Sequence, residues 1–215
     1  MGLCDQGVFG AWRNKVGNVV GRVRQGRNVY AIYQPQVANP RTPAQLRYRR
    51  IFTAMTQLGR VLLPVLKVGF ASLDGYRYGS AYSSFIGFNI KSREAYVYDA
   101  QTGVARPKYD KLAVSVGNLP LGVSMVGTLD GSEISATWSD NSGTGTAAAE
   151  DVCYMAVYNP TKLSCIYVGT AKRSDRVARI ECPAAWSGDT VESWAFFRSE
   201  KGECSETWYL GSFNL

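Results

Sequence analysis

The stretch DVCYMAVYNPTKLSCIYVGTA, residues 151–171, decides the fold class of this chain. Its two arms, 151–159 and 164–171, are rich in Val, Ile and Tyr, the residue types that favour β-strands. The junction of the two arms, Asn-Pro-Thr-Lys at 159–162, is typical of a turn. The stretch therefore predicts two strands joined by a turn.

The same texture of short strands and turns extends from about residue 112 to the end of the chain. Seven or eight strands at this spacing, with few long crossovers, predict a β-sandwich. We expect Trp138, the Tyr154/Ala156/Tyr158 face and the Trp194/Phe196 face to fill the space between the two sheets. The predicted strands are 111–117, 123–129, 133–140, 151–159, 164–171, 176–183, 190–199 and 204–213.

The N-terminal part predicts a β-hairpin. Two apolar-alternating segments, 17–24 and 27–34, flank Gln25-Gly26, and Gly accepts the positive φ that tight hairpin turns require. The alternation places Arg22 and Arg24 on one face of the first strand. Pro35 ends the second strand, because proline cannot donate to a sheet.

A helix is predicted to follow, starting within NPRTPAQLRYRR, residues 39–50. Thr42 is the expected N-cap, Pro43 fits the first helical position, and Gln45 can reach back to the cap. Downstream residues at helical spacing predict a buried stripe, with Arg47, Arg50 and Gln57 on the opposite side. That stripe comprises Tyr48, Ile51, Met55, Leu58 and Leu62.

Two further features complete the predicted layout. Pro64 should break or kink this helix, and residues 78–98 indicate a second helix. Residues 99–111 are a polar connection. The predicted fold class is thus α+β, with a hairpin and helical domain over 1–111 and an all-β domain of immunoglobulin or fibronectin III type over 112–215.

Composition excludes several classes of protein. The chain has 215 residues, 46% hydrophobic, which is typical of an ordered globular protein. No window reaches eighteen apolar residues, so no membrane-spanning helix is expected. The N-terminus lacks the pattern of a secretory signal, and Gln6 stands where myristoylation requires Ser or Thr. We therefore expect synthesis in the cytoplasm.

The side chains that most enzymes use are missing. The chain has no histidine and no C-x-x-C pair, which excludes His-dependent catalytic sites and disfavours structural zinc. No phosphate-binding or dinucleotide-binding glycine motif occurs. We predict no enzymatic activity, no cofactor and no metal, with a hydrolase using only Asp and Glu as a remote third class. The five cysteines are expected to be free thiols in a reducing compartment, and disulfides among the last four would require an oxidising one.

Charge divides the chain unevenly. Residues 1–70 hold eleven Lys or Arg against one acid, whereas residues 121–215 hold seven against twelve. Such asymmetry indicates two regions with different partners. Arginine near tyrosine can bind phosphates and bases, but its planar fork also pairs with carboxylates, so protein and nucleic acid both remain open as partners. The candidate contact residues are Arg22, Arg24, Arg27, Arg41, Arg47 and Arg50.

Aromatic residues of the β part are a second set of candidates. Trp186, Trp194 and Trp208 could bind a sugar or a protein partner, but at strand spacing most such residues belong to the core. The C-terminal segment resembles a fibronectin type III module in Trp138 of ATWSD, in VYN ending a central strand, and in its late Trp and Tyr alternation. That resemblance implies a topology and no chemistry.

The whole chain resembles a functionally uncharacterised bacterial family of Bacteroidetes type. The residues that carry this resemblance are GVFGAWRNKVGNVVGRVRQGRNV, NPRTPAQLRYRRIF, GNLP, TWSD and SETWYLGS. The hairpin with the N-P-x-T-P-x-Q segment also resembles phage-derived proteins. The family implies no catalytic residues.

We therefore expect a non-enzymatic structural or assembly protein, most concretely a component of a phage or phage-like particle (a virion). Its basic N-terminal part would dock onto other protein subunits in a homo- or hetero-oligomer, with no membrane involved. The alternative is a basic nucleic-acid-binding accessory protein inside the cell.

Overall fold

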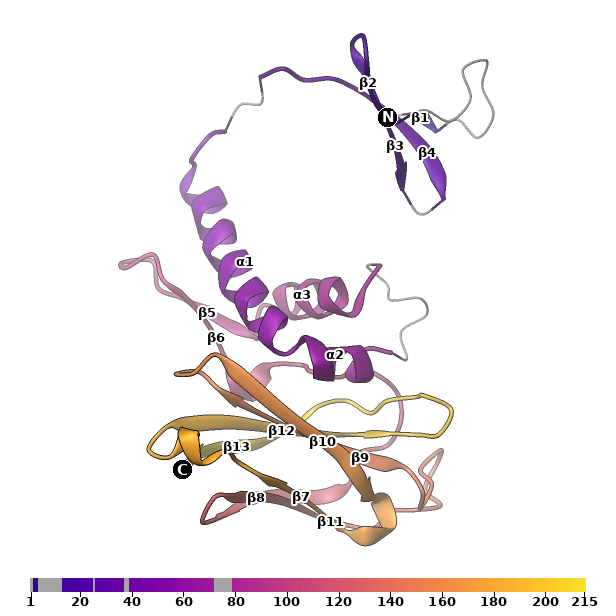
Figure 1. The fold of residues 1–215 in the computed structure, drawn as a ribbon, viewed down its shortest axis with the longest axis vertical. Coiled ribbons are helices and arrows are strands. Elements are labelled where there is room, and N and C mark those ends of the chain that lie inside the picture. The colour runs from indigo at the N-terminus through magenta and orange to yellow at the C-terminus, as the bar shows by residue number, and fades with distance from the viewer. Residues whose placement is uncertain (1, 4–12, 25, 37–38, 72–78) are drawn as a thin grey trace. The chain divides into compact units, whose positions relative to one another are not determined.

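The structure is a computed structural model, and its chain forms two compact units, residues 1–42 and 43–215. Each unit is described by itself. The residues that the structure describes are 2–3, 13–24, 26–36, 39–71 and 79–215 (Figure 1).

The first unit is an antiparallel sheet with strand order β1-β4-β3-β2. Strands β3 and β4 form the predicted hairpin, with Arg24 opposite Arg27 at its tip and Gly26 at φ 75° in the turn. Val29 of β4 is buried, at 4% exposure. The strands are β1 (Gly2–Leu3), β2 (Asn14–Val16), β3 (Val19–Arg24) and β4 (Arg27–Ile32).

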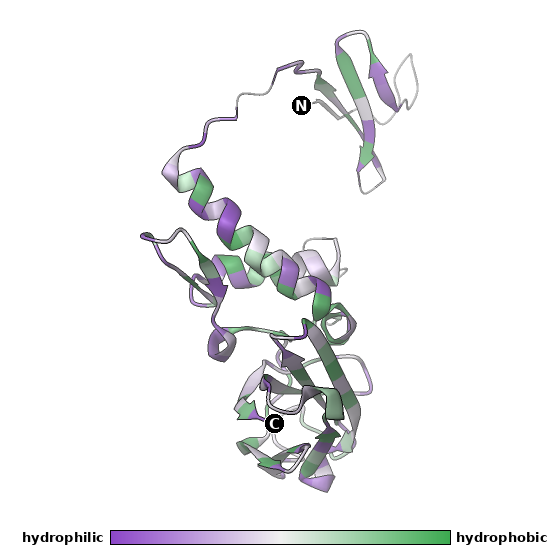
Figure 2. Ribbon diagram, turned by 60° about the vertical axis from the view of Figure 1, so that its left-hand side comes forward, coloured by the Kyte–Doolittle hydropathy of each residue, from purple (hydrophilic) through white to green (hydrophobic). Residues whose placement is uncertain are grey.

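The second unit begins with α1, Pro43–Val61, which starts directly after Thr42 as the sequence predicts. Four members of the predicted stripe are buried. The fifth, Tyr48, is 58% exposed, so that prediction is wrong. The reason is positional: all residues of the first two turns, up to Arg50, are exposed, and burial begins at Ile51. Figure 2 shows hydrophobic and hydrophilic residues alternating along this helix.

The break at Pro64 is confirmed. Helix α2, Leu63–Gly69, follows α1 at a bend of 86° and has proline in its first turn, where the missing N–H costs nothing. Among the described residues no single helix is long and apolar enough to cross a membrane, and only this bent pair taken together passes that test of length and composition.

The second predicted helix is shorter than expected. Helix α3 covers Ala81–Ser92, and the Ser80 hydroxyl caps it by accepting a hydrogen bond from the Ser83 N–H at 3.1 Å. Arg93, at φ 61°, ends it in the left-handed conformation. The end of the predicted helix instead forms strand β5, Tyr96–Tyr98, which pairs with β6, Ala105–Pro107. Residue 78 lies outside the described residues.

The predicted strand at 111–117 is not present. Backbone groups there bond to side chains rather than to a neighbouring strand: Ala113 N–H donates to Asn89 Oδ1, and Val114 N–H and Ser115 N–H donate to Thr207 Oγ1. A short 3-10 turn, Tyr109–Lys111, precedes the segment. Buried apolar side chains therefore occur here without strand geometry.

The other predicted strands are confirmed and form two antiparallel sheets. One sheet has the order β10-β9-β12-β13 and the other β11-β8-β7. Short 3-10 turns at Arg173–Asp175 and Ala184–Trp186 connect strands. The strands are β7 (Val123–Asp130), β8 (Glu133–Ser139), β9 (Val152–Asn159), β10 (Ser164–Lys172), β11 (Val177–Glu181), β12 (Thr190–Arg198) and β13 (Trp208–Asn214).

Both faces of the four-stranded sheet are covered (Figure 1). Met155, Val157 and Phe197 pack toward the three-stranded sheet, where Trp138 meets Phe197 edge-on at 5.2 Å between ring centroids. The opposite face packs against the helices. The placement of Trp138 between the sheets is confirmed.

The Tyr154/Ala156/Tyr158 and Trp194/Phe196 faces do not lie between the sheets, contrary to the prediction. Ala156, Tyr158, Trp194 and Phe196 instead share a core with α1, α2 and α3. Strands buried on both sides carry apolar residues at nearly every position, so alternation alone does not say which face meets which layer. Because the helices share this core with the sheet, the compact units divide after Thr42 and not at residue 111.

Candidate interaction surfaces

The first candidate surface is one face of the β3–β4 hairpin. Residues two apart on a strand, or directly opposite on its neighbour, share a face, so Arg22, Arg24 and Arg27 lie together. All three are exposed. The sequence has no acidic residue between Asp5 and Asp74, and among the described residues no ion pair involves these arginines. We call these three residues the basic hairpin face.

The other predicted contact residues lie elsewhere. Arg41 is exposed just before α1, and Arg47 and Arg50 are exposed on the first turns of α1. The structure thus brings three of the six arginines together in the first unit and two on one helix in the second.

Arg47 has an aromatic partner that the sequence did not predict. Its guanidinium carbon lies 5.4 Å from the ring centroid of Tyr98, within the range of a cation–π interaction. Tyr98 was expected inside a helix, so its position opposite α1 depends on the β5–β6 hairpin. In the first unit, Lys15 makes a similar contact with Tyr33, at 3.7 Å.

A groove runs along α1 and has two compartments. The first, about 520 Å³, lies between α1 and the β5–β6 hairpin. The second, about 460 Å³, continues toward the turn after β9. Both are lined by Ala54, Gln57 and Ala105, so they meet there. We call this feature the α1 groove, and it is not predictable from the sequence because its two walls are far apart in the chain.

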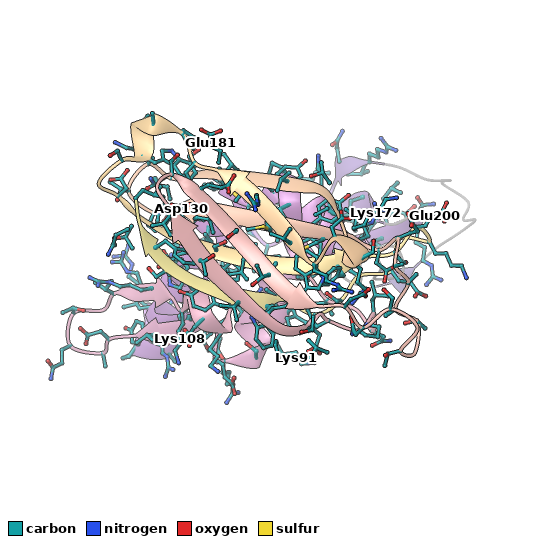
Figure 3. The ribbon with its side chains drawn as sticks, turned by 90° about the horizontal axis from the view of Figure 1, so that it is seen from below. Lys91, Lys108, Asp130, Lys172, Glu181 and Glu200 are labelled. Atoms are coloured by element: carbon teal, nitrogen blue, oxygen red, sulfur yellow. The ribbon has the colours of Figure 1, made fainter. Side chains whose placement is uncertain are left out.

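The outward face of the three-stranded sheet carries acidic residues at one end. Asp130 pairs with Glu133, and Glu133 pairs with Glu181, so the three carboxylates lie in a row across the strands. Arg179 compensates part of this charge through its contact with Glu133 at 3.4 Å. Figure 3 shows Asp130 and Glu181 at one end of the sheet and Lys172 toward the other.

One ion pair is deeply buried. The Arg173 side chain is 0% and the Asp151 side chain 2% exposed, and Nε donates to the carboxylate at 3.1 Å. The other guanidinium nitrogens donate to Asn141 Oδ1 at 2.7 Å and to the Pro120 carbonyl at 2.8 Å. The polar groups of this network form hydrogen bonds with one another and are buried from solvent. We therefore assign the network a role in stabilising the loops that it connects rather than in binding a ligand.

A second buried carboxyl group lies on the helix-facing side of β12. Glu192 accepts hydrogen bonds from the Tyr209 hydroxyl at 2.5 Å and from the Ser212 hydroxyl at 3.2 Å. Burial raises the pKa of Glu192, and these two hydrogen bonds oppose the shift. Nearby, burial raises the pKa of Tyr109 to about 12. Because the carboxylate is occupied by neighbours, we assign it a structural role.

The described residues include neither a cluster of metal-binding side chains nor a reactive cysteine. Among the described residues no three His, Cys, Asp or Glu side chains gather as metal ligands. The four described cysteines are free thiols, and burial raises the pKa of Cys153 and of Cys165 to about 12, which keeps both unreactive. Cys4 lies outside the described residues.

Of the three tryptophans considered for surface recognition, two are buried. Trp186 is 5% exposed and Trp194 is 0% exposed, with the Trp194 indole N–H bonded to the Tyr109 carbonyl at 2.9 Å. Only Trp208, at 39% exposure, remains available to a partner.

The comparison with protein families now gives the class of this chain. It belongs to a family of unknown function (DUF6266), which matches residues 10–211. The predicted membership of an uncharacterised family is confirmed, while the bacterial group and the phage origin stay predictions. A comparison with curated proteins gave no match.

Proposed function

We propose that this protein is a non-enzymatic assembly protein that docks through the basic hairpin face onto an acidic surface of another protein subunit. The observation that carries the proposal is the concentration of Arg22, Arg24 and Arg27 on one exposed face, with no acidic residue among the described residues of that unit. Three like charges placed side by side repel one another, and an acidic partner relieves that repulsion.

The partner that we propose is a second copy of the chain. Its three-stranded sheet carries the row of Asp130, Glu133 and Glu181, which is complementary in charge. A contact between two different surfaces of identical subunits is head-to-tail and repeats, so it builds rings or filaments. Such behaviour suits a component of a larger particle, and a phage or phage-like particle is the setting that we propose for it.

In this proposal the second unit, residues 43–215, has a structural role and presents the acidic surface. We infer a fibronectin III-like sandwich, because three strands (β7, β8, β11) oppose four (β10, β9, β12, β13) in that order and because Trp138 fills the space between the sheets. The likeness concerns the architecture and implies no chemistry. The helices close the outer face of the four-stranded sheet, whereas Asp130 and Glu181 on the outward face of the three-stranded sheet are exposed.

Charge reversal tests the proposal. We expect the full chain carrying Arg22→Glu, Arg24→Glu and Arg27→Glu to lose self-association that the parent shows in sedimentation velocity at about 0.05 M salt, since exposed charges are weakly screened there. Lys91→Glu, an exposed change on α3, is the matched control and should leave association intact. Unchanged association of the triple variant would refute the docking role.

The alternative, nucleic-acid binding, predicts a different result. In that case the parent would bind an arbitrary single-stranded oligonucleotide with steep salt dependence, because each neutralised phosphate releases counterions. The triple variant would lose this binding, while self-association would be absent from the parent or unaffected by the reversal.

A further inference from the structure

We infer that the α1 groove binds an extended peptide segment of a partner protein, with two carboxylates spaced to meet Arg50 and Arg60. This surface lies wholly within residues 43–215 and is independent of the basic hairpin face.

Charge is the first argument. Arg50 lines the first compartment and Arg60 the second, and no acidic residue of the described part of the chain lines either one. Both arginines are exposed, and among the described residues neither forms an ion pair. The groove therefore offers two uncompensated cations to a ligand.

Spacing is the second argument. The two arginines are ten positions apart in one helix, which places them about 15 Å apart along its axis. An extended chain advances about 3.3 Å per residue and turns residues an even number apart to the same face, so carboxylates about four residues apart, which spans about 13 Å, match the two cations.

Apolar and amide side chains form much of the remaining lining of the groove. Leu46, Val104 and Leu163 line the groove as apolar side chains exposed by 41%, 43% and 65%, and such surface is buried favourably by an apolar side chain. Gln57 lies where the compartments meet, and its amide can both donate to and accept from a peptide backbone.

The same lining disfavours nucleic acid. Binding of single strands relies on open aromatic rings onto which successive bases stack. In this groove the Tyr98 ring faces the Arg47 guanidinium, while Tyr109 packs against Tyr158 and Trp194 at 6.0 and 6.2 Å between centroids. Tyr158 is only 4% exposed. The available surface is aliphatic and amide rather than aromatic.

A pair of isomeric peptides tests the inference on the full chain. The probe is a fluorescently labelled peptide of Val, Thr and Ser with two glutamates about four residues apart, and its isomer has the two glutamates adjacent. We expect saturable binding of the spaced peptide in fluorescence anisotropy, tighter than that of the isomer by roughly tenfold. Arg50→Glu and Arg60→Glu should each abolish the preference, whereas Lys91→Glu should preserve it.

Three results would overturn the inference: no saturable binding of the spaced peptide, equal binding of the two isomers, or tighter Arg50-dependent binding of an oligothymidine than of the peptide. Because the triple variant of the hairpin retains the groove, it should bind the spaced peptide as the parent does. That measurement separates failure of this inference from failure of the proposed assembly role.

Discussion

Removing the charge of Asp151 should destabilise the second unit strongly, because among the described residues its carboxylate is the one that forms an ion pair with the fully buried Arg173 guanidinium. Burial lowers the pKa of Arg173, and the Asp151 carboxylate opposes that shift. Breaking a buried ion pair from one side typically costs about 3–5 kcal/mol. In Asp151→Asn the side-chain oxygen can still accept from Arg173 Nε and from the Ala148 N–H, which favours the lower end, about 3 kcal/mol.

For a unit of this size, that loss corresponds to a fall in melting temperature of roughly 6–12 °C. The assay is urea unfolding followed by tryptophan fluorescence, since Trp138 and Trp194 are both buried. Glu150→Gln is the matched control, because it breaks the neighbouring Lys172–Glu150 pair, whose side chains are 51% and 69% exposed. We expect that control to unfold almost as the parent does. Equal unfolding curves for Asp151→Asn and Glu150→Gln would show that the buried ion pair contributes no more to stability than the exposed one.

Three further changes probe other parts of the chain. Thr42→Ala should reduce the free energy of unfolding by about 1 kcal/mol if Thr42 caps α1, and identical denaturant melts of variant and parent would exclude that cap. Asn89→Ala should cost about 2–3 kcal/mol in the same melts, because it leaves buried backbone groups of the 113 region without partners; a loss under half of that would contradict the anchoring role. Burial raises the pKa of Glu192 in the folded state, so the folded protein binds this proton more tightly than the unfolded chain does. The free energy of unfolding therefore falls as pH rises through the raised pKa of the folded state. Glu192→Gln should flatten this part of the stability profile in urea melts at a series of acidic to neutral pH values, and an unchanged profile would contradict the assignment.

The sequence predicted the turns and helix ends that depend on a single glycine, proline or helix-capping residue. Gly26 placed the hairpin turn, the sequence Thr42-Pro43 placed the start of α1, and Pro64 placed the bend before α2. In each case one residue type fixes backbone geometry without help from distant parts of the chain. The C-terminal strands were predicted for a similar reason, since turn residues separate them at short intervals.

The sequence did not predict features that depend on contacts between residues remote in the chain. Residues 111–117 look like a strand, but their backbone is held by Asn89 and Thr207, which are remote in sequence. Tyr48 has the spacing of a core residue, yet its side chain is 58% exposed. Periodicity identifies a helix face, but it does not say how far a covering layer extends.

The candidate contact surfaces divide in the same way. Strand alternation with the hairpin register was sufficient to place Arg22, Arg24 and Arg27 together. The α1 groove was not predictable, because its opposite wall comes from residues that were expected to be helix or connection, among them Tyr98 and Val104. Only the folded β5–β6 hairpin places that wall beside α1.

The most direct test of the proposed assembly role mixes two full-length variants. One carries Arg22→Glu, Arg24→Glu and Arg27→Glu, so that its hairpin and its three-stranded sheet are both acidic. The other carries Asp130→Lys and Glu181→Lys, so that both of its surfaces are basic.

We predict that neither variant self-associates in sedimentation velocity at about 0.05 M salt and that an equimolar mixture recovers the association of the parent, because each docking surface then meets its complement. Association of either variant alone to the extent of the parent, or a mixture that sediments as the sum of its two separate components, would contradict the account.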